Sequence, residues 1–233
     1  MIDDRRLFES LDGDLRRSVE LIANEFAEGF AAVAKIKKPA VSIFGSARVP
    51  EDDPAYTYAR ETARLFGVAD WSVITGGGPG VMEAANRGAR EGGAQSIGFN
   101  IELPHEQAPN PYLDISVTFR HFYARKVCFV KPAEGFVIFP GGFGTLDELF
   151  EALTLIQTDK VLDFPVVLFN SVYWERLLAF VRSDLLARGM ISPEDLELLH
   201  VVDDPAEAVE VVDECYERRC AQLTAEPAKA DAQ

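Results

Sequence analysis

The chain has 233 residues, 48% of them hydrophobic, which is enough for one sizeable α/β domain with its own core. Its net charge of −15 argues against a general nucleic-acid binder, which would need a basic face. No apolar run could span a bilayer, no signal-peptide pattern stands at the start, and Cys128, Cys215 and Cys220 lack zinc or CxxC spacing, so we expect a cytoplasmic protein with no membrane or metal partner.

The first predicted element is an amphipathic helix. Residues 1–13 are polar and expected to be loose. From Leu15 to Lys35 apolar residues recur at spacings of three and four, which is typical of a helix. A lysine pair and Pro39 end it. We therefore treat residues 1–39 as an N-terminal extension that packs on the core or on a partner subunit.

From residue 40 onwards short apolar strands alternate with helices. The predicted strands are 40–44, 71–75, 95–99, 116–119, 135–139, 165–169 and 200–202. The predicted helices are 54–66, 81–91, 120–130, 146–157, 172–187, 193–199 and 205–220. This alternation predicts a doubly wound α/β fold with a mainly parallel sheet of about six to seven strands and helices on both faces. Residues 221–233 are expected to form a frayed, disordered tail.

The first two predicted strands each end in a turn that could contact a ligand. The strand 40–44 ends at Gly45-Ser46, which can offer Ser46 to a ligand or can be a plain turn. The strand 71–75 is followed by Gly76-Gly77-Gly78-Pro79-Gly80 and a helix. This turn is neither the dinucleotide fingerprint nor a P-loop, because the last small residue and a Gly-Lys-Ser/Thr are missing. Glu83, near the start of that helix, could simply oppose the helix dipole.

A proline-rich loop and a basic pair follow. Residues 100–112 contain three prolines, and a loop of this length inside a compact domain is often functional. Arg125 and Lys126 lie in the predicted helix 120–130. On their own they are read as a solvated basic face.

The most informative stretch runs from Pro140 to Glu148. A strand, the glycines Gly141, Gly142 and Gly144, and a helix N-terminus follow one another, an arrangement suited to binding a phosphate. Thr145 adds a hydroxyl and Glu148 a carboxylate one turn along. The same letters also fit a capping box, with Thr145 as the N-cap and Glu148 reaching back to its N–H. Local pattern leaves the two interpretations open.

The stretch Pro-Gly-Gly-x-Gly-Thr-x-x-Glu resembles the signature of the LONELY GUY family, often labelled lysine decarboxylase-like, whose members are nucleoside 5′-monophosphate phosphoribohydrolases. Gly-Gly-Gly-x-Gly-Val-Met-Glu, from Gly76 to Glu83, resembles the second motif of the family. The loop at 100–110 is similar to that of longer bacterial members, and Arg125-Lys126 matches an Arg-Lys pair. The residues before this pair differ from the Met-His-x of plant-type members. The resemblance covers roughly residues 40–220, which we expect to form a Rossmann-like nucleotide-binding domain.

The resemblance implies a hydrolase that cleaves the N-glycosidic bond of AMP or an N6-substituted, cytokinin-type AMP, with no metal or organic cofactor. It implies that Arg125 and Glu148 are catalytic. The residues implied in substrate binding are Ser46, Gly77, Gly78, Glu83, Lys126, Gly141, Gly142, Gly144 and Thr145.

The resemblance also implies a homodimer or larger homo-oligomer, and the predicted helix 146–157 agrees, because it is apolar on two faces. Leu146, Leu149, Phe150 and Leu153 are expected to face the sheet, with Ala152 and Leu155 opposite. The alternative function is a binding module that holds a nucleotide without turnover. An amino-acid decarboxylase is disfavoured because no lysine stands in a recognisable pyridoxal phosphate pocket.

Overall fold

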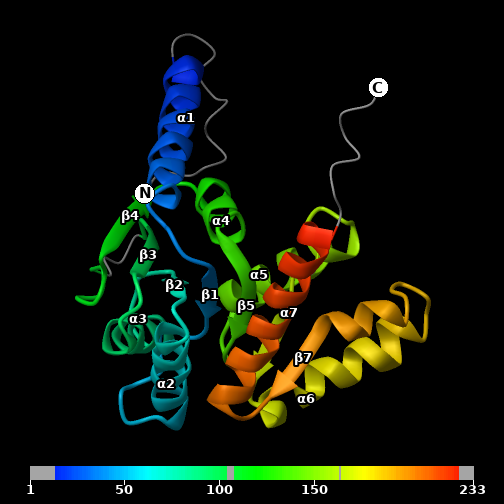
Figure 1. Ribbon diagram of the computed structural model, residues 1–233. Helices are drawn as coiled ribbons and strands as arrows, with labels where there is room; N and C mark the ends of the chain where they lie inside the picture. Colours follow the sequence, from blue (N-terminus) through cyan, green and yellow to red (C-terminus); the bar gives the residue numbers. More distant parts are fainter. Residues whose placement is uncertain (1–13, 104–107, 163, 226–233) are drawn as a thin grey trace.

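The computed structural model describes residues 14–103, 108–162 and 164–225 (Figure 1). The expectations for residues 1–13, for part of the proline-rich loop (104–107) and for the tail from 226 lie outside the described residues. In chain order the elements are α1 (Asp14–Val33), β1 (Ala40–Phe44), α2 (Pro54–Val68), β2 (Ser72–Thr75), α3 (Val81–Gly92), β3 (Ser96–Ile101), β4 (Ile115–Phe119), α4 (Phe122–Val130), β5 (Ala133–Ile138), α5 (Phe143–Gln157), β6 (Val166–Phe169), α6 (Ser171–Phe180), a π-helical segment (Val181–Leu186), a 3₁₀ turn (Glu194–Leu198), β7 (Leu199–Val202) and α7 (Pro205–Ala225).

The strands form one seven-stranded sheet in the order β4-β3-β2-β1-β5-β6-β7, and each neighbouring pair is parallel. The predicted α/β class is therefore confirmed. The chain builds outward from β1 on one side and then continues at β5 on the other. In open α/β sheets, ligands bind at the carboxyl ends of the strands where the winding direction changes, which is here between β1 and β5.

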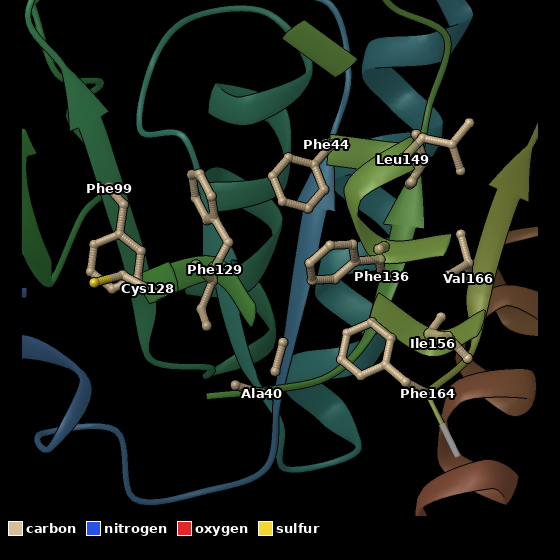
Figure 2. Packing of buried hydrophobic residues seen from close by; sticks show 14 of the residues in the cluster. Ala40, Phe44, Phe99, Cys128, Phe129, Phe136, Leu149, Ile156, Phe164 and Val166 are labelled. Carbon is tan, nitrogen blue, oxygen red and sulfur yellow. The ribbon is translucent and has the colours of Figure 1, made fainter. Parts of the chain in front are cut away.

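Helices cover both faces of the sheet. One core lies under α2, α3 and α7, and the other under α4, α5 and α6 with part of α1 (Figure 1). On the second face the rings of Phe129 and Phe136 pack edge-on against Phe44, with centroid distances of 5.0 and 4.9 Å (Figure 2). This aromatic cluster anchors α4 against β1 and β5, directly below the carboxyl ends of those strands.

The buried face of α5 differs from the prediction. Leu149, Ala152 and Ile156 are buried in the core, whereas Phe150 is 41% exposed. Ala152 therefore faces the sheet and not the opposite side, and Phe150 points largely outward. Leu146 and Leu153 pack on the edge of the core as partly buried residues.

Helix α1 packs on the core of its own chain. The carboxylate of Glu25 accepts hydrogen bonds from the backbone N–H groups of Arg120 and His121 at 2.7 and 3.2 Å, and lies 2.9 Å from Nδ1 of His121. Gly29 lies so close to Cys128 that an added Cβ would be 2.5 Å from its sulfur. The extension thus supports the start of α4.

At the C-terminal end the helices also depart from the predicted bounds. The predicted helix 172–187 is α-helical only to Phe180 and continues as a π-helical segment, and α7 runs on to Ala225 where the sequence predicts an end at 220. Within the described residues no helix has both the length and the apolar composition needed to cross a bilayer.

Candidate functional site

A cavity of about 800 Å³ lies at the carboxyl ends of the central strands, within the size range of small-molecule sites. The β1–α2 turn borders it on one side, where the N–H of Ser46 donates to the carbonyl of Pro140 at 3.0 Å and joins the two turns at the switch point. Its walls are Phe44, Gly45, Ser46, Ala47, Arg48, Gly76, Gly78, Met82, Asn100, Ile101, Leu103, Phe122, Arg125, Phe129, Gly142, Phe143, Gly144, Thr145, Leu146 and Glu148.

The N-terminus of α5 forms an open cradle in this cavity. Gly142 is the N-cap, and no side chain caps the helix. The N–H groups of Phe143, Gly144 and Thr145 belong to the first turn, which has no partners inside the helix. A Cβ on Gly142 or Gly144 would meet nothing within 4 Å, and neither residue has a positive φ. Neither protein packing nor backbone conformation therefore requires glycine at these two positions. The missing side chains leave free space above the first-turn N–H groups, which are donors suited to an anion.

Glu148 does not act in a capping box. Because the helix begins at Phe143, Thr145 is already inside it and Glu148 lies on its second turn, away from the free N–H groups. Glu148 is only 5% exposed, and among the described residues its Oε2 has no hydrogen-bond partner. The capping interpretation is therefore wrong, and a buried carboxylate with an unused oxygen faces the cavity.

The pKa of the Glu148 carboxyl is raised to about 7, mainly because the group is buried. Lys126 and Arg125 counteract this, whereas Glu151 and Asp147 add to it. A carboxyl group that titrates near neutral pH in a cleft is typical of a group that takes part in a reaction.

Arg125 lies across the cavity from its own helix to the ends of the strands. Its Nε donates to the carbonyl of Phe99 at 2.6 Å, and its guanidinium lies over the ring of Phe129, 4.9 Å from the centroid. An added Cβ on Gly76 would be 2.5 Å from a terminal nitrogen of Arg125, so Gly76 makes room for this side chain. Burial lowers the pKa of Arg125 to about 10, against the opposing charge of Glu148, and the side chain remains cationic at neutral pH.

Lys126 lies outside the cavity walls. Its Nζ is 2.9 Å from Oδ2 of Asp147 and 3.0 Å from Oε2 of Glu151, the second contact being an ion pair without hydrogen-bond geometry. The two residues of the predicted basic pair therefore have different surroundings, because adjacent helical residues point in different directions. Arg125 enters the cavity and Lys126 joins α4 to α5.

The remaining predicted residues fall into two groups. Ser46, Gly78, Gly142, Gly144 and Thr145 line the cavity. Three others contact the protein instead. Gly77, at φ 71°, lies against Asn100; Tyr56 donates to Glu83 at 3.4 Å; and the carbonyl of Gly141 accepts from Tyr173 at 2.6 Å. A direct ligand contact by this second group stays a prediction without geometric support.

The sequence analysis missed the residues that hold the second glycine turn. Asn110 donates from its backbone to the carbonyl of Gly77 at 2.8 Å and from its side chain to that of Gly78 at 3.0 Å. Asn100, with its amide nitrogen facing the turn, donates to Gly76 and Gly77 at 3.2 and 3.1 Å. Asn110 is buried although it lies in the proline-rich loop. The sequence signal that could have identified Asn110 is its place as a polar residue at the end of the proline-rich loop.

The sequence analysis also missed three apolar residues and one arginine of the cavity wall. Met82, Phe122 and Phe143 line the cavity, and Arg48 adds an exposed guanidinium on the β1–α2 turn. Met82 and Phe143 stand inside the two quoted motifs but were not singled out there, and Arg48 and Phe122 reach the cavity only through the sheet topology.

The parallel sheet with a ligand-sized cavity at its switch point defines a Rossmann-like α/β protein. Residues 82–212 match the family described as "possible lysine decarboxylase", and the chain belongs to this family, which includes the LONELY GUY proteins. The resemblance noted in the sequence is therefore confirmed.

Relatives with curated names give the family its chemistry. A pyrimidine/purine nucleotide 5′-monophosphate nucleosidase of Escherichia coli is 34% identical over 125 residues, which cover 48% of this chain but only 27% of that protein. A cytokinin riboside 5′-monophosphate phosphoribohydrolase of Mycobacterium tuberculosis is 30% identical, over 67% of this chain and 86% of that protein. An enzyme of the same name from Arabidopsis thaliana is 30% identical, over 65% and 72%.

Solved structures agree on the fold. The Moco carrier protein of Chlamydomonas reinhardtii superposes with a TM-score of 0.58 at 26% identity, covering 78% of this chain and 99% of that chain. A molybdenum cofactor binding protein of Rippkaea orientalis superposes with a TM-score of 0.56 at 22% identity, covering 77% and 98%. This arrangement of sheet and helices thus occurs also in proteins named for binding a cofactor.

Proposed function

We propose that the protein hydrolyses the N-glycosidic bond of nucleoside 5′-monophosphates, releasing the base and ribose 5-phosphate. The observation that carries this is the carboxylate of Glu148, buried beside Arg125 with an unpaired oxygen, in the cavity that the α5 cradle opens into. The names of the relatives, nucleosidases and phosphoribohydrolases, support the same reaction.

In the proposed reaction the bond between C1′ and the base nitrogen breaks and a C1′–O bond to water forms. The sugar passes through an oxocarbenium-like cation. Ionised Glu148 stabilises this cation and accepts a proton from the attacking water, and the departing base takes up a proton from solvent. Glu148 then returns its proton to solvent, so the products differ from the substrate only by the added water. Lys126 and, to a smaller extent, Arg125 favour the charged form of Glu148, and Arg125 stabilises the charge that develops on the leaving group. The free N–H groups of Phe143, Gly144 and Thr145 bind the 5′-phosphate.

The aromatic and aliphatic walls of the cavity suit a base. Met82, Leu103 and Phe122 lie with Phe143 along the lining, and Phe143 is 93% exposed at its edge. We assign AMP or an N6-substituted AMP to the site on this apolar character. A panel of nucleoside monophosphates, with the free base detected by chromatography, tests the activity and identifies the base.

The alternative is a protein that binds a nucleotide without turnover, and the structural likeness to the Moco carrier protein favours it. In that case Glu148 would be a buried carboxylate without a task, which is costly to retain. Tight nucleotide binding in calorimetry with no base released from any member of the panel would favour the alternative. We further propose a cytoplasmic location, which cell fractionation checks.

A first prediction concerns the 5′-phosphate. Because the α5 cradle offers its donors to an anion, adenosine should be turned over at least about 10²-fold more slowly than AMP, measured as kcat/KM, the loss expected when a charge-assisted contact is removed. Adenosine and AMP cleaved at comparable rates would contradict the assignment of the cradle.

A second prediction concerns the oligomeric state, which we propose is a homodimer. Helices α4 and α5 carry four exposed aromatic side chains, Phe122, Tyr123, Phe143 and Phe150, of which Phe122 and Phe143 also line the cavity. Light scattering at micromolar concentration should give twice the monomer mass, and Phe150→Glu should lower it. Val172→Glu, at another exposed apolar position, on α6, is the control and should not. A fully active monomer would refute the dimer.

A further inference from the structure

One ammonium group joins the two helices that carry the candidate catalytic residues. Lys126 follows Arg125 on α4, and its Nζ lies 2.9 Å from Asp147 and 3.0 Å from Glu151. These two acids flank Glu148 on α5, one residue before it and three residues after it. The Lys126 side chain is 17% exposed, so this bridge is partly shielded from solvent.

We propose that Lys126 is a positioning residue: with Asp147 and Glu151 it fixes α4 against α5 and keeps Glu148 ionised for the reaction. This inference rests on the proposed function. It gives Lys126 a task other than the substrate contact that the family resemblance implies, and it assigns tasks to Asp147 and Glu151.

The charges around Glu148 are evenly matched. Arg125 and Lys126 approach it from α4, and Asp147 and Glu151 lie beside it on α5. Arg48, on the β1–α2 turn, lines the same cavity, and the described part of the cavity lining contains no histidine. Because two cations and two anions lie close to this buried carboxylate, removing any one of the four charges changes the pKa of Glu148.

The sign of each change can be stated in advance. Burial is the largest influence on Glu148, and Lys126 is the largest one opposing it, so loss of the Lys126 charge raises the Glu148 pKa. Loss of the Asp147 or Glu151 charge lowers the Glu148 pKa, provided that Lys126 stays in place. If these three residues had a purely structural role, their loss would not produce an upward shift of the Glu148 pKa for Lys126 and a downward shift for Asp147 and Glu151.

The direct test is a carbon-13 carboxyl NMR titration of Glu148, whose signal is identified by its absence in Glu148→Gln. Lys126→Met should move its pKa upward by about one pH unit, the low end of the effect of a nearby opposite charge. Asp147→Asn should move it downward, and Lys126→Arg should leave it near the wild-type value. Lys160→Met, which removes an exposed lysine three residues beyond the end of α5, is the matched control and should have no effect.

Base release supplies the second readout. The acid limb of the kcat profile should move in the same direction as the titration, with KM changed less than kcat. An unchanged Glu148 pKa in both Lys126→Met and Asp147→Asn, or shifts in the same direction, would overturn the inference. If Lys126→Met does not fold, Asp147→Asn and Lys126→Arg decide it. If the variants show the expected NMR shifts but the wild-type protein releases no base, the proposed function is refuted and the charge coupling is not.

Discussion

Glu148→Gln is expected to lower base release by on the order of 10²-fold or more, while the protein still folds and binds nucleotide. The substitution keeps the shape of a buried side chain and removes the charge that faces the oxocarbenium ion. Because the helix cap is Gly142, no cap is lost. Single-turnover assays of base release from AMP measure the effect, and calorimetry with AMP measures binding.

The same variant has a pH-dependent effect on stability. In the folded protein the Glu148 pKa is raised to about 7, above the ordinary glutamate value of the unfolded chain. As pH rises, Glu148 therefore loses its proton at a lower pH in the unfolded chain than in the folded protein. The contribution of Glu148 to the free energy of unfolding of the wild type falls as pH rises from about 4.5 to 7. Glutamine has no such cost, so Glu148→Gln should gain stability relative to the wild type over this window in denaturant titrations.

Glu210→Gln on α7, an exposed position on the opposite face of the sheet, is the matched control and should change neither activity nor the pH dependence of stability. Near-normal base release by Glu148→Gln would show that the carboxylate is not catalytic. In that case another group in the cavity would have to carry the reaction.

The sheet was predictable because its strands are short, buried and apolar, and the glycine turns that end them are local signals. The start of α5 was not. Thr145-x-x-Glu148 fits a capping box, yet the helix begins two residues before Thr145, at Phe143, with no side chain capping it. The faces of α5 were misassigned as well, because both sides are apolar and only packing on Phe136 and its neighbours decides which is buried.

The candidate site was predictable where one segment supplies it and not where distant segments meet. Gly142 to Glu148 form one wall, and their chemistry is evident from their order. The opposing wall needs the sheet order, which brings Asn100 at the end of β3 beside the β2–α3 turn. The role of Lys126 could not be predicted for the same reason, because the direction of each side chain of an Arg-Lys pair depends on what packs against the helix.

Arg125→Lys is expected to lower base release by on the order of 10²-fold or more, although the formal charge is kept. Lysine lacks the planar fork that donates from Nε to the carbonyl of Phe99 at 2.6 Å and stacks on the ring of Phe129. The burial that lowers the pKa of Arg125 to about 10 lowers that of a lysine there as well, so its charge is less secure at neutral pH.

The assay is kcat for base release from AMP, with Arg176→Lys on the exposed face of α6 as the matched control. Because Arg125 and Glu148 interact within one cavity, we expect their losses not to add: Glu148→Gln combined with Arg125→Lys should be little slower than Glu148→Gln alone. Fully additive losses would mean that the two side chains act independently. Arg125→Lys with wild-type kcat would remove Arg125 from the reaction and leave it as a support for Phe99 and the end of β3.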